Sequence, residues 1–211
     1  MAKGQQETFQ IHLARHLSAG PHEIDLERPL NDEGVAKGAE LYRLYAGYGE
    51  ANRVTHAYTG PAKRTRDTVR AILGHDFSST RVLDCLMPFS GVMAVAYKKV
   101  EQGGWGFGDD VARYASNLET RQHLLAAAEA TVANSIGALQ RQEWSPRNGE
   151  ILFFCSHSGS TNFVAYVMSQ GLGKVKVAPA EMLLQMNLDP GDRIIMTFTL
   201  HGDLTNTVIL D

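Results

Sequence analysis

The sequence is poor in cysteine: Cys85 and Cys155 are the only two in 211 residues, and they form no Cys-x-x-Cys pair. A disulfide framework and a cysteine zinc site are therefore not indicated. Long hydrophobic runs are also missing. No stretch approaches the roughly 18 uninterrupted apolar residues of a membrane span, and the initial MAKGQQETF has no hydrophobic segment of the signal-peptide kind. We therefore expect a cytoplasmic protein with no membrane contact.

An excess of charge of one sign is lacking too, because 20 lysines and arginines face 23 aspartates and glutamates, for a formal charge of −3. The basic residues are spread along the chain rather than gathered in a tract, so a nucleic-acid partner is not expected. Hydrophobic residues make up 44% and charged residues 20%, which is enough of both for a packed core and a polar surface. At roughly 150 residues per domain, we expect residues 1–211 to form a single domain with an inserted lobe.

Strand and helix patterns alternate along most of the chain. Apolar residues at every second position predict a strand over 9–13, and helical spacing follows the candidate N-cap Asn31. The other strand-like stretches are 54–58, 81–83 and 151–155, and the other helical patterns are 62–73 and 160–171. This alternation favours a layered α/β fold, and the continuous apolar run at 151–155 is typical of a buried parallel strand.

The region between the third and fourth strand-like stretches has a different composition. Residues 109–142 are rich in Ala, Leu, Glu, Gln and Arg and contain no proline, which predicts one long helix or two helices broken near Asn117. A glycine-rich stretch at 103–108 precedes them and predicts a flexible hinge. We expect a helical lobe over about 92–145.

The C-terminal part has two β-prone stretches, 194–200 and 207–210. A turn at Pro190–Asp192 is predicted to lie between them. These features indicate a closing hairpin or a pair of edge strands.

Unusual polar residues stand at the ends of three of the predicted strands. Arg15 and His16 follow the first strand, Arg64 lies in the first turn of the helix after the second, and His157 follows the fourth. Open parallel sheets collect ligands at the carboxyl ends of their strands, so these side chains are expected to converge. Two guanidiniums and the backbone amides of 158–160 at a helix start suit a phosphoryl group. The expected ligand is a phosphate.

The run Ala14-Arg15-His16 resembles the Arg-His signature of the histidine phosphatase superfamily, which includes the phosphoglycerate mutases. Three further blocks resemble that family and follow in its order: Arg28-Pro29-Leu30-Asn31 with Gly34, Thr59-Gly60-Pro61-Ala62-Lys63-Arg64 with Thr68, and Ile151 to Gly159. The blocks span most of the chain except about residues 92–145. The pattern is closest to that of the small phosphatases of the superfamily, such as phosphohistidine phosphatases.

The resemblance implies a phosphoglycerate mutase-like fold, a three-layer α/β/α sandwich with a mostly parallel central sheet. It implies that His16 and His157 are catalytic, with His16 as the nucleophile that forms a phosphohistidine, and that Arg15 and Arg64 bind the phosphate. The substrate would be a phosphorylated small molecule or a phosphoprotein, and neither a metal nor a cofactor is implied. The neighbouring arginines should depress the pKa of His16 and keep it nucleophilic near neutral pH.

Two departures from the family pattern bear on the chemistry. Leu17 stands where many members have glycine. The glutamate that many members carry soon after the third strand is also missing, and Asp84 is the nearest carboxyl. A general acid contributes about 10² to 10⁴ in rate for a poor leaving group, so a site without one fits phosphohistidine, acyl phosphates or aryl esters. Mutase activity is disfavoured for the same reason.

Other classes remain open on the sequence alone. A phosphate-binding relative without turnover would keep the same cationic pocket. Ser158 follows a strand and precedes a helix, and with Asp192 and His201 it has the chain order of an α/β-hydrolase triad, although the first glycine of the nucleophile elbow is missing. A metal pair of His12 and His16 is disfavoured, because four residues of strand separate them by roughly 13 Å.

Overall fold

A mixed sheet of six strands organises the computed structural model, which describes residues 6–47, 53–74, 77, 79–86, 111–157, 159–171 and 180–210. The strands are β1 (Thr8–Arg15), β2 (Val54–Thr59), β3 (Thr80–Val82), β4 (Ile151–Ser156), β5 (Arg193–Thr199) and β6 (Leu204–Leu210), in the spatial order β3-β2-β4-β1-β5-β6. The strands β1 to β4 pair with one another in parallel, and β5 pairs antiparallel with both β1 and β6. The expected mostly parallel sheet is confirmed.

The strand β4 lies inside the sheet between β2 and β1, and all of its residues are buried. Its apolar run Ile151–Cys155 needs no alternation because helices cover both faces. One face carries Phe153 against Leu41 and Tyr45, and the other carries Phe154 and Leu152. The sequence prediction of a buried parallel strand at this position is confirmed.

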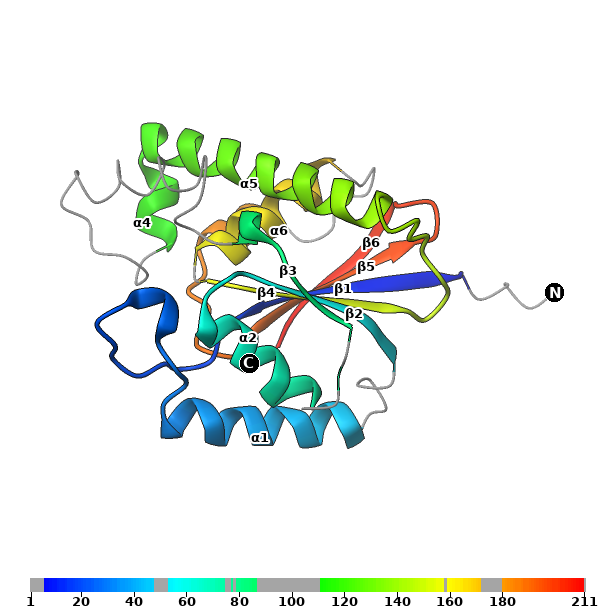
Figure 1. Ribbon diagram of the computed structural model, residues 1–211. Coiled ribbons are helices and arrows are strands. Elements are labelled where there is room, and N and C mark those ends of the chain that lie inside the picture. The colour runs from blue at the N-terminus through cyan, green and yellow to red at the C-terminus, as the bar shows by residue number, and fades with distance from the viewer. Residues whose placement is uncertain are drawn as a thin grey trace.

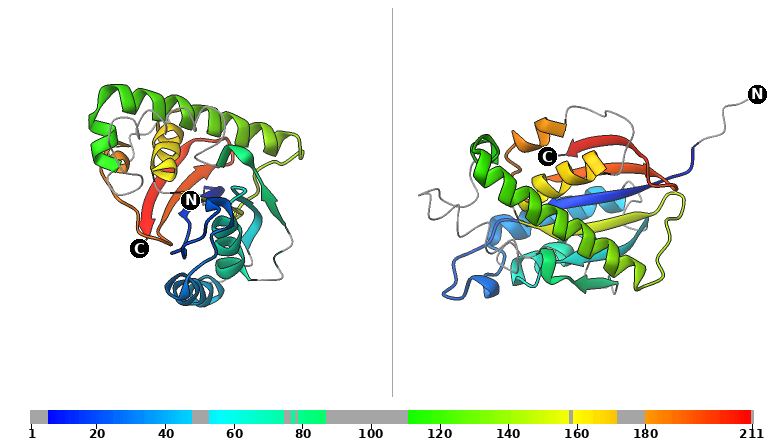
Figure 2. Two further views of the ribbon diagram at one scale, coloured as in Figure 1. Left: turned by 60° about the vertical axis from the view of Figure 1, so that its left-hand side comes forward. Right: turned by 90° about the horizontal axis from the view of Figure 1, so that it is seen from above.

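Helices form a layer on each side of the sheet (Figures 1 and 2). They are α1 (Asp32–Gly47) and α2 (Lys63–Leu73) on one side, and α4 (Val111–Ser116), α5 (Leu118–Gln140) and α6 (Ser160–Gly171) on the other, with the short 3-10 turns η1 (Asp25–Glu27), η3 (Asp84–Leu86) and η4 (Ala180–Leu184). The three-layer α/β/α sandwich is therefore confirmed. None of the helices described is both long and apolar enough to cross a membrane.

Asparagine caps set two of the helix starts. The Asn31 side chain accepts a hydrogen bond from Gly34 N at 2.8 Å, and Asn117 accepts one from Thr120 N at 3.0 Å. Of the two predicted alternatives, two helices broken near Asn117 are therefore confirmed, because the chain leaves the helical conformation there to form the second cap. The part of the expected lobe over 92–110, with the glycine stretch 103–108, lies outside the described residues.

One sequence prediction about the C-terminal strands is wrong. The turn at Pro190–Asp192 precedes β5 and does not join the two strands. Residues 200–203 make the hairpin turn, and Gly202 adopts a positive φ of 89° there. The Pro-Gly pair identified a turn correctly, but turn residues do not specify which strands they connect. Of these two strands, β6 lies at an edge of the sheet and β5 does not, since β5 pairs with both β1 and β6.

Candidate active site

The two predicted catalytic histidines follow neighbouring parallel strands. Arg15 of β1 is in register with Ser156 of β4, and His16 N donates a hydrogen bond to Ser156 O at 2.9 Å. Both strands therefore end at the same edge of the sheet. The rings of His16 and His157 lie with their centroids 5.0 Å apart at an interplanar angle of 71°.

A backbone contact fixes the protonation of the His16 ring. Its Nδ1 lies 2.7 Å from Leu17 O. A carbonyl oxygen only accepts hydrogen bonds, so Nδ1 carries the proton and donates it. In the neutral ring Nε2 then keeps its lone pair, as a nucleophile attacking phosphorus requires.

The surroundings keep this imidazole neutral. The pKa of His16 is lowered to about 4, mainly by burial, although the hydrogen bond to Leu17 O acts in the opposite direction. The positive charges of Arg64, Arg15 and Arg28 lower it further. Neutral His16 therefore predominates at every pH above about 4.

The first turn of α2 places Arg64 beside this pair. The hydroxyl group of Thr68 links that turn to the chain after β1, because Oγ1 donates to Arg64 O at 2.7 Å and accepts from Leu17 N at 3.0 Å. The residue after His16 is thereby tied to the helix that carries Arg64. Leu17, which stands where many family members have glycine, is fully buried, in the core cluster that also holds Leu41.

Arg64 is almost completely buried and contacts His157. Its Nη2 donates to His157 Nδ1 at 3.4 Å, so that nitrogen is the acceptor and the proton of the neutral ring lies on Nε2. His157 Nε2 and Arg64 Nε are both buried, and neither finds a hydrogen-bond partner among the described residues. A buried donor left without a partner costs about 1–3 kcal/mol, which is a reason to expect a ligand here.

The pKa of His157 lies well below its ordinary value. Burial is the main cause, and His16 and the charges of Arg64, Arg15 and Arg28 lower it further. His157 is therefore a neutral hydrogen-bond donor, and the arginines supply the positive charge.

Arg15 is held by its Nη1, which donates to Leu188 O, and by its backbone N, which donates to Asp192 O at 3.0 Å.

The sequence analysis missed two residues of the site, Arg28 and Asp25. Arg28 anchors the loop after β1, because its Nε donates to Gly20 O at 2.9 Å. Asp25 lies directly on Arg64: its carbonyl accepts from Nη1 at 2.7 Å and its Oδ2 from Nη2 at 3.0 Å. Arg28 Nη1 also approaches Asp25, at 3.4 Å from Oδ1. We call Arg15, Arg28, Arg64 and His157 the anion cage.

Asp84, the carboxyl closest to the family's proton-donor position, is exposed on η3. Its neighbour Leu86 accepts a hydrogen bond from Ser156 Oγ at 2.9 Å, which ties η3 to the end of β4. Asp25 contacts the anion cage through Arg64 and Arg28.

The structure weighs against two of the alternatives. Asp192 and His201 stand before and after β5, whose seven residues separate them by about 20 Å, so they do not form a triad. Ser158 lies outside the described residues. No group of three metal-ligating side chains occurs in the parts of the chain that are described. His12 is a buried core residue that bonds Tyr45 Oη at 2.8 Å.

Comparison with known proteins places the fold in a class. Neither a family model nor a curated protein matches the sequence. The chain nevertheless has the phosphoglycerate mutase-like fold on which histidine phosphatases are built, so the expected resemblance is confirmed at the level of the fold.

Three solved structures illustrate the match. The protein histidine phosphatase SixA, complexed with tungstate, aligns with a TM-score of 0.55 at 16% identity over 96% of both chains. A phosphoserine phosphatase mutant from Entamoeba histolytica, in complex with phosphoserine, gives 0.54 at 13% over 96% of this chain and 95% of that one. Phosphoglycerate mutase from Bacillus anthracis gives 0.55 at 10% identity over 95% of this chain and 92% of that one.

Proposed function

We propose that the chain is a metal-independent phosphatase of the histidine phosphatase type, which forms a phosphohistidine at His16. The observation that carries this proposal is the pairing of a neutral His16, whose Nδ1 is committed to Leu17 O, with a buried Arg64 and His157 at the same sheet edge. This arrangement combines a nucleophilic nitrogen with donors for the phosphoryl oxygens, and the fold supports it.

The chemistry follows in two steps. In the first, the lone pair of His16 Nε2 forms a bond to phosphorus while the bond from phosphorus to the leaving group breaks, and its electron pair departs with the leaving atom. In the second, water attacks phosphorus, the N–P bond breaks, and its electron pair returns to Nε2 as the water loses a proton to solvent. Arg15, Arg28, Arg64 and the Nε2–H of His157 would stabilise the charge on the phosphoryl oxygens in both steps.

Asp25 bears on the choice of leaving group. Burial raises its pKa, but the hydrogen bonds and charges of Arg64 and Arg28 outweigh that effect and bring the pKa below its ordinary value. Asp25 is therefore an anion at neutral pH and a poor proton donor. This favours substrates whose leaving group departs unaided, such as phosphohistidine in a phosphoprotein, or a small acyl or aryl phosphate.

The test is release of phosphate from acetyl phosphate and from a phosphohistidine peptide. The wild type should turn over at least one of them, and His16→Ala should lose about a thousandfold or more in kcat, as expected when a nucleophile is removed. His123→Ala is the matched control, because His123 lies on α5, where it pairs with Glu119, and not in the anion cage. Turnover by His16→Ala at the wild-type rate would refute the proposal.

A second candidate, a phosphate binder without turnover, is favoured by the Asp25–Arg64 ion pair, which engages part of the anion cage. Titration calorimetry with inorganic phosphate separates the two candidates. Saturable binding by a wild type that hydrolyses neither substrate would support the binder.

A further inference from the structure

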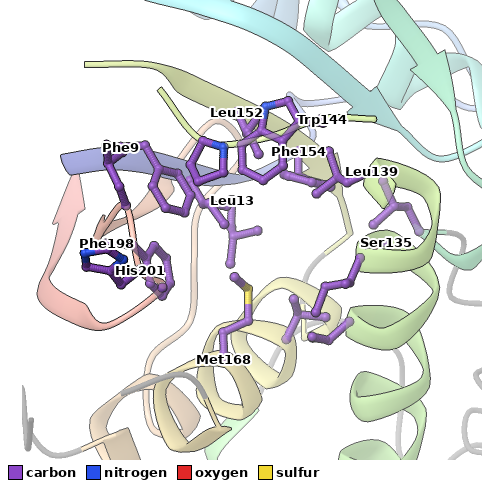
Figure 3. Close-up of a pocket in the computed structure, with 18 residues that line it drawn as sticks. Phe9, Leu13, Ser135, Leu139, Trp144, Leu152, Phe154, Met168, Phe198 and His201 are labelled. Atoms are coloured by element: carbon purple, nitrogen blue, oxygen red, sulfur yellow. The ribbon is translucent and has the colours of Figure 1, made fainter. Parts of the chain in front are cut away.

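An apolar cavity of about 270 Å³ lies between the sheet and the helices α5 and α6 (Figure 3). The sheet contributes side chains such as Phe9, Leu13 and Phe154, and the helices contribute Leu139 and Met168. Protein interiors contain few voids larger than a water molecule, so a cavity of this size requires a structural explanation.

The elements around the cavity account for its shape. Phe9, Ile11 and Leu13 face it from alternate positions of β1, which extends the wall over about 13 Å. Val132, Ser135 and Leu139 face it from one side of α5, over about 10 Å. The cavity is therefore elongated along the strand and the helix.

The helix α5 is held away from the sheet by its neighbours. It packs on α6, α4 and η3, and Thr131 Oγ1 donates to Cys85 O of η3 at 3.2 Å. Supported in this way, α5 spans the space above β1 and β4 instead of closing onto it. The gap is thus a consequence of the fold and not of a single small side chain.

The walls offer very little to a polar ligand. The Ser135 hydroxyl already pairs with Cys85 Sγ at 3.8 Å, and Trp144 Nε1 donates to Glu150 Oε1 at 3.1 Å. Exposed lining residues, Ile136 on α5 and His201 in the β5–β6 turn, mark the opening to solvent. Apolar walls of this kind favour apolar molecules, as in an engineered closed cavity of about 150 Å³ in another protein, which binds benzene.

We propose that this cavity is a binding site for an unbranched aliphatic chain of medium length, whose polar end lies at the opening beside His201. The elongated shape favours a chain over a compact ring. The opening beside the β5–β6 turn leaves a carboxylate or hydroxyl end in water, so the interior needs to provide no partner for it. This site is separate from the anion cage and does not depend on the proposed phosphatase activity.

Fluorescence of Trp144, which lines the cavity, provides the test. The chain has two tryptophans, so Trp105→Phe leaves Trp144 as the only one. Titration with 10-bromodecanoic acid should quench it saturably, because bromine enters the cavity. Competition by unbromined acids should improve about fourfold for each added methylene between hexanoic and decanoic acid. Absence of saturable quenching, or competition that does not depend on chain length, would overturn the proposal.

Matched variants on α5 locate the binding. Ser135→Leu fills the cavity and should weaken binding by about tenfold or more, whereas Ala133→Leu adds the same side chain to the exposed face and should leave it unchanged. Equal affinity in the two variants would place the ligand elsewhere and contradict the proposal. If Ser135→Leu fails to fold, the chain-length series on the Trp105→Phe protein decides the question by itself.

Discussion

Asp25 occupies one side of the guanidinium that is proposed to receive the phosphoryl group. The Arg64 side chain is 4% exposed and that of Asp25 is 49% exposed, so a half-exposed carboxylate covers a buried cation. A phosphate that binds Arg64 must displace this carboxylate or share the guanidinium with it. Asp25→Asn removes the competing charge and keeps the shape, so we predict that the variant binds phosphate more tightly than the wild type.

The size of this effect follows from the exposure of the pair. Exposed ion pairs contribute about 0–1 kcal/mol, and hydrogen bonds to charged groups about 1.5–3 kcal/mol. A pair with only one buried partner should lie near the lower of these ranges, at about 1 kcal/mol, which corresponds to about a fivefold change in affinity. Because the pKa of Asp25 lies below its ordinary value, the gain should persist from pH 8 to pH 5.

Isothermal titration with inorganic phosphate at pH 7 measures this change. Glu27→Gln provides the control, because it also converts a carboxylate to an amide on η1, and Glu27 is exposed. An Asp25→Asn protein that binds phosphate as the wild type does, or more weakly, would refute the reasoning. It would show that Asp25 holds Arg64 in position and does not compete for it.

Three further predictions concern protons and positioning. Because the pKa of His16 is about 4, its protonation should not lower kcat/KM for an aryl phosphate until the pH falls below about 4. A value of kcat/KM that keeps rising below pH 4 would contradict this prediction. His12, His16 and His157 have lowered pKa values and so bind fewer protons when folded. The free energy of unfolding should therefore fall as pH drops from about 6.5 to 4, by up to about 1.4 kcal/mol per pH unit for each histidine, and urea unfolding curves that coincide at pH 7 and 5 would contradict this. Thr68→Val leaves Leu17 N without its acceptor, so it should lower the free energy of unfolding by about 1–3 kcal/mol and should also lower kcat/KM. Wild-type stability together with wild-type kcat/KM would show that the hydroxyl does not position the site.

Much of the site was accessible to sequence reasoning because its residues follow directly from strand ends. Arg15 ends β1, His16 follows it and His157 follows β4. Neighbouring parallel strands end at one edge of the sheet. Arg64 lies in the first turn of α2, and the Gly60-Pro61 pair before that helix predicts where it starts. The local signals therefore coincide with the three-dimensional arrangement.

The rest could not be predicted, because it depends on contacts between segments without a periodic pattern. Asp25 reaches Arg64 through a loop that is closed by the bridge between Ala19 and Leu30 and by Arg28. Nothing in the sequence of that loop specifies how it folds back over α2. The apolar cavity was equally hidden, since the residues that line it have the spacing of ordinary core positions.

Rapid-quench trapping with a ³²P-labelled acyl or aryl phosphate tests the central claim most directly. The account predicts a phosphoprotein that is acid-labile and base-stable and that is lost in His16→Ala but kept in His123→Ala. A label that persists in His16→Ala, or that is stable to acid and labile to base, would contradict a phosphohistidine at His16.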